Sequence, residues 1–176
     1  YAEIICRYRI EFIEKLNNKI KKIHSEVTEN KEKLEIKYIT ECENKENYLS
    51  LLKQRRKLDI IKGFTTKGIH RDDFKCFIND KEIEIYGSQG QHRTAILSLK
   101  LAELYVIYDE IGEYPILLLD DFMSELDEKR RKSFLSYIKD TQVIITCTDK
   151  MELDNIKLFN VSNGIIVDYY KKIIYY

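Results

Sequence analysis

A short and almost entirely apolar run near residue 116 constrains the fold more than any other part of this 176-residue sequence. Ile116-Leu117-Leu118-Leu119 follows Pro115 and ends on Asp120-Asp121. A run of this length without alternating polar residues is typical of a strand buried on both faces, as in a parallel sheet. A second run of the same character covers residues 143–146, with a helical pattern between the two. The order of strand, helix and strand predicts an α/β fold.

The first third of the chain predicts two helices with a strand between them. Apolar residues recur every three or four positions from Ile5 to Val27, which places one apolar stripe along a helix. Alternation of apolar and charged residues over 34–38 predicts a short strand. A second helix is expected from about Asn44 to Ile61. The side chains expected to face inward on it are Tyr48, Leu51, Leu52, Leu58 and Ile61.

Turn residues separate the later apolar segments. The apolar residues between Phe74 and Ile85 flank Asn79-Asp80-Lys81, which predicts a β-hairpin. The segment 95–107 is apolar nearly all round, so we expect a buried helix that ends near Gly112. Asn163-Gly164 lies between two apolar segments and predicts a second hairpin.

Charge is unevenly distributed although the net charge is zero. Residues 1–62 hold 15 basic and 11 acidic side chains, a net charge of +4, and residues 63–176 hold 15 and 19, a net charge of −4. The change of charge falls near Gly63, and we place a domain boundary there. This predicts a helical lobe over 1–64 and a second unit over 65–176. Lys53, Arg55, Arg56 and Lys57 form a basic patch in the first lobe, either as a solvated helix face or as a contact for nucleic-acid phosphates.

Several classes of protein are disfavoured by what the sequence lacks. Neither a G-x-x-x-x-G-K-S/T phosphate loop nor a G-x-G-x-x-G motif is present, which argues against a self-contained P-loop or dinucleotide enzyme. The longest apolar stretch is too short to span a bilayer, and no signal peptide opens the chain, so we expect no membrane association. The four cysteines are far apart, which favours free thiols in a reducing cytoplasm over a zinc site.

Three short segments carry chemistry. Asp120-Asp121 follow a buried strand, where a carboxylate can hold Mg²⁺ and a neighbouring one can orient water, although a loop cap explains a single acid equally well. Ser88-Gln89-Gly90-Gln91 begins the apolar helix, and a helix N-terminus can bind phosphate or simply be capped by its serine. Ser124-Glu125-Leu126-Asp127 leads into a helix that should continue to about Lys139.

In this order, these features resemble the second half of an ATP-binding-cassette head, with its signature motif, Walker B strand and D-loop. They closely resemble the RecF family of bacterial DNA replication and repair proteins. The sequence departs from the family at Ile69, where Pro is usual, and at His92, where Gln is usual, and neither position carries the nucleotide chemistry. The segments that carry the resemblance are 65–73, 87–94, 99–103, 114–127 and 144–149.

The resemblance implies a role for each residue of the serine turn. Ser88 and Gly90 would bind the γ-phosphate of an ATP molecule held on a partner subunit. Gln89 and Gln91 would shape the turn, and Arg93 would support it.

It also implies roles for residues beyond the apolar strand. Asp120 would be the metal ligand that holds Mg²⁺, and Asp121 would take the place of the catalytic glutamate that positions water. Ser124 and Asp127 would cross a dimer interface, and Thr148 falls where many related ATPases carry a switch histidine. The shorter Asp121 side chain and the missing histidine imply slow ATP hydrolysis.

The implied protein is a slow, Mg-dependent ATPase of DNA replication, repair and the SOS response. It would form an ATP-dependent homodimer, bind DNA gaps and single-strand/double-strand junctions, and help RecO and RecR partners load recombinase. The present chain would be the C-terminal half of an ABC/SMC-like ATPase head with part of a helical arm lobe. Because the Walker A half is missing, we expect no ATPase activity from this chain alone.

Two other interpretations remain open. The chain resembles SMC/Rad50-like head ATPases in general, but those usually insert a long coiled coil, and the arm here is short. In a non-enzymatic interaction domain, the same acids would bind Mg²⁺ or nothing. Cleavage or phosphorylation at Asp120-Asp121 would need further convergent acids or a partner lysine, and neither pattern is evident.

Overall fold

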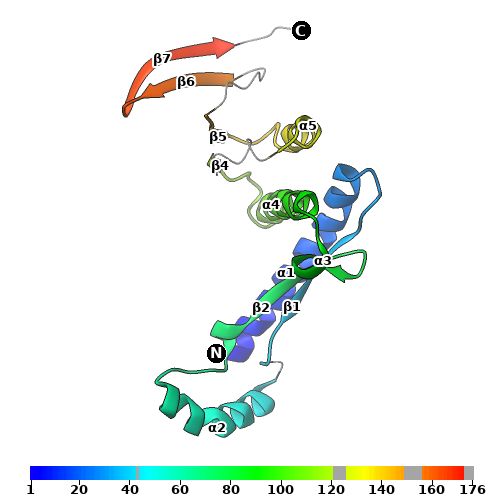
Figure 1. Cartoon of the computed structure of the whole chain (residues 1–176), viewed down its shortest axis with the longest axis vertical. Coiled ribbons are helices and arrows are strands. Elements are labelled where there is room, and N and C mark those ends of the chain that lie inside the picture. The colour runs from blue at the N-terminus through cyan, green and yellow to red at the C-terminus, as the bar shows by residue number, and fades with distance from the viewer. Residues whose placement is uncertain (43, 121–125, 149–155, 173–176) are drawn as a thin grey trace.

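A computed structural model of the chain describes residues 1–42, 44–120, 126–148 and 156–172. The elements form an elongated stack that begins with helix α2 (Lys45–Lys62) at one end. A hairpin of strands β6 (Ile156–Ser162) and β7 (Ile165–Lys172) lies at the other end (Figure 1). The predicted mixed α/β fold is confirmed. Within the described residues, no helix is long and apolar enough to cross a membrane.

The lower half of the stack is a long helix beside a small antiparallel sheet. Helix α1 (Ala2–Val27) packs against strand β1 (Leu34–Ile39), which pairs along its whole length with β2 (Asp73–Ile78). The predicted helix and strand are therefore confirmed. The apolar stripe of α1 is buried from Leu16 to Ile23, whereas Tyr8 and Phe12 in its first half are exposed and only the neighbouring Cys6 is buried there.

The predicted hairpin after β2 is present but shorter than expected. Asn79 and Asp80 adopt positive φ angles of 48° and 66°, and β2 then pairs with the two-residue strand β3 (Lys81–Glu82). The next residues form a single helical turn, α3 (Ile83–Tyr86), and not a continued strand. A strand would place Ile83 and Ile85 on the same face, whereas the turn buries Ile83 and leaves Ile85 exposed.

Helix α2 connects β1 to β2 and contributes no buried residue. The helix predicted from about Asn44 to Ile61 is confirmed. Asn44 is its N-cap, and it stops at Gly63, which has a left-handed conformation. The expectation that its apolar residues face inward is wrong for Ile61, which is 82% exposed, because little of the chain packs against this helix. The pairing of β1 with β2 crosses the boundary predicted at residue 64, and the two lobes stay a prediction.

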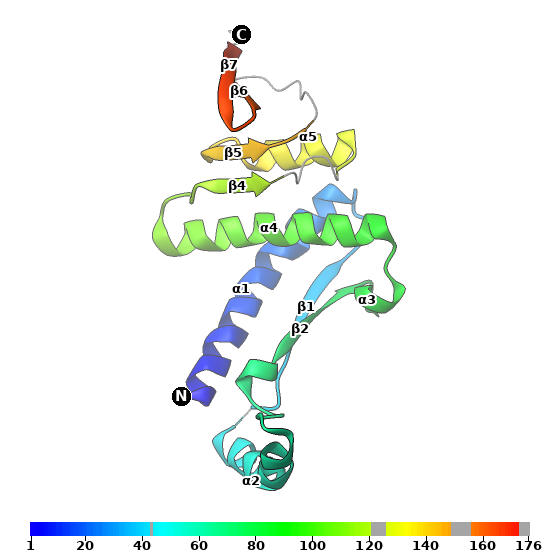
Figure 2. The ribbon, with the colours of Figure 1, turned by 60° about the vertical axis from the view of Figure 1, so that its left-hand side comes forward.

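Helix α4 (Gln89–Ile111) forms the centre of the molecule. Figure 2 shows it lying across the end of α1 on one side and beneath a parallel pair of strands on the other. This position explains why the helix is apolar nearly all round. It ends, as predicted, at Gly112, whose φ of 81° is the left-handed conformation that glycine adopts readily.

The parallel pair consists of β4 (Leu117–Asp120) and β5 (Val143–Thr146), with helix α5 (Glu128–Tyr137) between them in the sequence. The predicted strand, helix and strand are confirmed. The expectation of burial on both faces is wrong in this chain, because Leu119 is 7% exposed but its neighbour Leu118 is 69% exposed. Only one face of the pair packs against the core.

The chain ends in the second predicted hairpin. Strands β6 and β7 are antiparallel, and Asn163 and Gly164 between them both have positive φ, 51° and 75°. Positive φ at both central residues is the turn that an Asn-Gly pair favours.

Candidate functional site

Helix α4 begins with a reciprocal hydrogen-bonded cap. The Ser88 Oγ atom accepts a hydrogen bond from the Gln91 backbone N–H at 3.2 Å, and the Gln91 side-chain Oε1 accepts one from the Ser88 N–H at 2.9 Å. This capping box confirms Ser88 as the N-cap. The first turn of a helix has N–H groups without intrahelical partners and carries a partial positive charge, so it attracts anions.

A cavity of about 440 Å³ opens beside this turn. It is lined by the loop after α1 (residues 27–32), by the start of α4 (88–94) and by the start of α5 (127–130). Ser88, Gly90, Gln91 and Asp127, all predicted site residues, lie in this lining. Segments that are far apart in the sequence therefore meet in one place.

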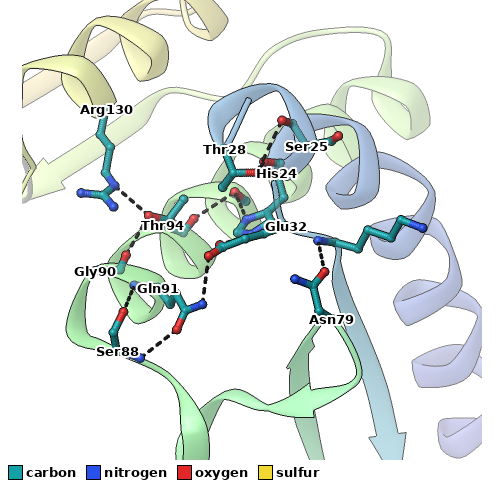
Figure 3. Close-up of polar contacts among 12 residues, drawn as sticks. His24, Ser25, Thr28, Glu32, Asn79, Ser88, Gly90, Gln91, Thr94 and Arg130 are labelled. Atoms are coloured by element: carbon teal, nitrogen blue, oxygen red, sulfur yellow. Dashed lines mark hydrogen bonds and ion pairs between the residues drawn. The ribbon is translucent and has the colours of Figure 1, made fainter. Parts of the chain in front are cut away.

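Arg130 joins the start of α5 to the start of α4. Its guanidinium Nε donates to the Thr94 Oγ1 at 2.7 Å, and its Nη1 forms an ion pair with Asp127 (Figure 3 shows Arg130 and Thr94). The Asp127 Oδ1 also accepts the Arg130 backbone N–H at 2.8 Å. This backbone hydrogen bond, with the nearby guanidinium charge, lowers the pKa of Asp127. Asp127 is thus the N-cap of α5, so the helix begins after Asp127.

The lining of the cavity holds three basic and three acidic side chains, so their formal charges sum to zero. Glu29 lies between Lys31, whose Nζ is 2.9 Å from Glu29 Oε2, and Lys129, which donates to Glu29 Oε1. The hydrogen bond from Lys129, followed by that from Lys31, lowers the pKa of Glu29 to about 2. Both lysines are exposed and are held by an exposed carboxylate. A bound anion would therefore compete with Glu29 for these two cations.

A chain of polar contacts reaches the turn from α1. Glu32 Oε1 accepts a hydrogen bond from Gln91 Nε2 at 2.9 Å, and Glu32 Oε2 lies 3.3 Å from His24 Nε2 (Figure 3). His24 is fully buried, and its Nδ1 lies 2.9 Å from Ser98 Oγ on α4. Burial lowers the pKa of His24, and the Glu32 carboxylate opposes this shift in part.

The predicted metal ligand lies elsewhere in the fold. Asp120 is exposed at the end of β4, and its Oδ1 accepts a hydrogen bond from Thr146 Oγ1 of β5 at 2.5 Å. Figure 2 shows β4 running opposite to α4, so β4, whose last residue is Asp120, ends on the side of the molecule on which α4 begins. Thr148 is exposed two residues beyond β5. Within the described parts of the chain, no three His, Cys, Asp or Glu side chains group as a complete metal site.

The other predicted residues are placed as follows. Gln89 and Arg93 are exposed in the first turn and a half of α4, outside the cavity lining. Asp121 and Ser124 lie outside the described residues. The sequence reasoning missed Glu32 and Arg130, which contact the serine turn and its helix.

The sequence has close relatives among known proteins, although no protein-family model matches it. The DNA replication and repair protein RecF of Clostridium beijerinckii is 48% identical over 178 residues, covering 96% of this chain and 48% of that protein. RecF of Clostridium perfringens strain 13 is 46% identical over 173 residues, covering 93% and 48%.

A solved structure agrees with these sequence relatives. It is described as the recombination mediator protein RecF-ATP in the RecFOR pathway, and it matches with a TM-score of 0.82 and 38% identity over 97% of this chain. The chain belongs to the RecF family. It spans about half the length of the RecF proteins it matches, and its mixed α/β fold corresponds to about half of the RecF structure.

Proposed function

We propose that this chain is the C-terminal portion of a RecF-type ATPase that acts in DNA replication and repair. Residues 65–176 would form the second half of an ATP-binding-cassette head, and residues 1–64 part of a helical arm. The observation that carries this proposal is the cavity in which the Ser88 turn meets Asp127. The turn and Asp127, which we assign to a signature motif and a D-loop, then line the same space. The names of the RecF relatives support the role in DNA repair.

The Ser88 turn would bind the γ-phosphate of an ATP molecule held on a partner copy. Backbone N–H groups of the first turn of α4 donate to phosphate oxygens, and Gly90 lets the phosphate approach the backbone closely. Lys31 and Lys129 supply further positive charge once the phosphate displaces Glu29 from them. ATP then joins two copies of the protein, because each copy contributes to the site of the other.

Asp120 fits the role of a magnesium ligand. Its carboxylate is exposed at the carboxyl end of a parallel strand, and Mg²⁺ prefers hard oxygen ligands while keeping several waters and phosphate oxygens. The hydroxyl of Thr146 engages Oδ1 and orients the group. When bound, Mg²⁺ neutralises phosphate charge. Asp121 would orient the attacking water and accept its proton, and Thr148 cannot supply the base that a histidine would, so hydrolysis is slow.

DNA would be the macromolecular partner, bound at gaps and single-strand/double-strand junctions together with RecO and RecR partners. The exposed cations of α2, which are Lys53, Arg55, Arg56 and Lys57, support this part of the proposal. Phosphate contacts by such cations dominate the affinity of proteins for DNA.

Ser88→Arg tests the proposed phosphate site. In the protein that carries both halves of the head, ATP with Mg²⁺ should shift the wild-type protein from monomer to dimer in analytical ultracentrifugation. An arginine side chain in the turn fills the space of the phosphate, so the dimer should be lost. Ser50→Arg, on the exposed surface of α2, should dimerise normally. ATP-dependent dimerisation of Ser88→Arg at wild-type strength would refute the proposed site.

A further inference from the structure

The capping box at Ser88 works only with one orientation of the Gln91 side-chain amide. Its oxygen must face the Ser88 N–H, which it accepts at 2.9 Å, and this points the NH₂ group away from the turn. The opposite orientation would place two donors against each other. Any acceptor that holds the NH₂ group therefore lies outside the turn.

Glu32 is that acceptor. An ionised carboxylate can only accept hydrogen bonds, so Glu32 Oε1 at 2.9 Å selects the NH₂ side of Gln91. Glu32 lies in the loop between α1 and β1, 59 positions before Gln91. It thereby connects the loop after α1 to the serine turn.

His24 fixes the Glu32 carboxylate from the other side. Burial lowers the pKa of His24, and a neutral imidazole has one N–H group. The Ser98 Oγ lies 2.9 Å from both His24 Nδ1 and the Thr94 carbonyl oxygen, and its single hydrogen serves one of them. With the imidazole hydrogen on Nε2, the ring donates to Glu32 Oε2, and the Ser98 hydroxyl donates to Nδ1 in place of the Thr94 oxygen. This tautomer satisfies both ring nitrogens. Both oxygens of Glu32 are then engaged, one by α1 and one by α4.

We infer that Glu32, held by buried His24, is a positioning residue that sets the conformation of the Ser88 turn through Gln91. The phosphate-binding role of the turn rests on the proposed function. The contacts of Glu32 with Gln91 and His24 do not depend on it. The serine turn is thus held by residues outside its own motif.

Gln91→Glu separates this inference from ordinary helix capping. Glutamate is a standard residue at this position of a capping box, so capping alone predicts a turn as stable as the wild type. Positioning by Glu32 predicts the opposite, because two carboxylates would face each other. Amide hydrogen exchange at positions 88 and 91, measured by NMR in the 176-residue chain, should accelerate about tenfold.

A second substitution should rescue the first. In Gln91→Glu/Glu32→Gln, the amide NH₂ introduced at position 32 donates to the carboxylate introduced at position 91, while the amide oxygen accepts from His24. Exchange should then return to within about threefold of the wild type. Gln91→Glu/Glu35→Gln removes the same charge three residues away, where Glu35 pairs with Lys37, and should remain fast. Unchanged exchange in Gln91→Glu, or equal rescue by both second substitutions, would overturn the inference.

The same variants separate this inference from the proposed function. ATP-dependent dimerisation of the protein with both head halves should follow the exchange order, with loss in Gln91→Glu and recovery in the Glu32→Gln double variant. If exchange follows this order while dimerisation is unaffected, the positioning role holds and the phosphate-binding role of the turn fails.

Discussion

Arg130 shows how a single side chain can hold two helices of the site together. Replacing it with alanine leaves the Thr94 hydroxyl and the Asp127 carboxylate without their guanidinium partner. We expect Arg130→Ala to lower the free energy of unfolding by about 1–3 kcal/mol, which urea denaturation would measure. Lys132→Ala removes an exposed pair with Glu128 one turn away and should cost about 0.5 kcal/mol or less. Equal losses in the two variants would contradict the bridging role.

His24 makes the stability of the fold depend on pH. Its pKa is lowered in the folded state mainly by burial, so below about pH 6.5 the unfolded chain binds a proton that the folded chain does not. The free energy of unfolding should therefore fall as the pH drops from about 7.5 to about 5.5. Glu32 is the charged group that faces the ring and reduces the effect.

The matched variants for this prediction are His24→Gln and His70→Gln. His70 is exposed, so its replacement should preserve the pH slope, whereas His24→Gln should flatten it. Chemical denaturation at several pH values measures both slopes. A wild-type slope in His24→Gln would show that other groups cause the dependence.

The residues of the site differ in how far the sequence alone could predict them. Ser88 and Gln91 form a local pattern, and a Ser-x-x-Gln spacing before an apolar helix is a known cap. Glu32 and Arg130 contact residues 59 and 36 positions away, so no local pattern contains them. Glu32 lies between the predicted first helix and the predicted strand over 34–38, in a segment with no motif of its own.

At the scale of elements, the apolar pattern of β4 predicted the strand correctly but not its surroundings. An apolar run shows that both faces of a strand are able to be buried. In this chain, other elements cover only one face of β4. Helix α4 was predicted better, because α1 packs against it and the inner face of the strand pair shares its core. Helix α2 has a clear cap and stop signal, yet these local signals say nothing about whether another element covers its apolar side.

The two faces of β4 should differ sharply in their response to substitution. Leu119→Ala opens space in the core and should lower the free energy of unfolding by about 2–4 kcal/mol. Leu118→Ala, on the exposed face one residue earlier, should cost about 1 kcal/mol or less. Urea denaturation of both variants tests this. A large loss from Leu118→Ala in the isolated chain would mean that its outer face is covered.

At the scale of the whole molecule, the zero net charge conceals a separation of charge along the stack. Helix α2 lies at one end of the stack, remote from the serine turn (Figure 1). Its cations Lys53, Arg55, Arg56 and Lys57 are exposed, and no acidic partner within ion-pair distance is found for them in the described part of the chain. A helix that buries nothing but presents four such cations is better suited to binding than to core packing.

Neutralising these four cations tests whether α2 contacts DNA. The quadruple Lys/Arg→Gln variant should bind a gapped duplex more weakly in fluorescence anisotropy. The slope of log affinity against log salt should also shrink by about 0.9 for each DNA phosphate that the variant no longer neutralises. The control replaces four lysines of α1 by glutamine and therefore has the same net charge; these are Lys15, Lys19, Lys21 and Lys22. Two of them form ion pairs, Lys15 with Glu110 and Lys19 with Asp109. If both quadruple variants bind DNA equally weakly, the affinity for DNA depends on the total charge of the protein and not on α2. If the α2 variant loses more affinity than the α1 control, the phosphate contacts lie on α2, at the end of the molecule opposite the β6–β7 hairpin.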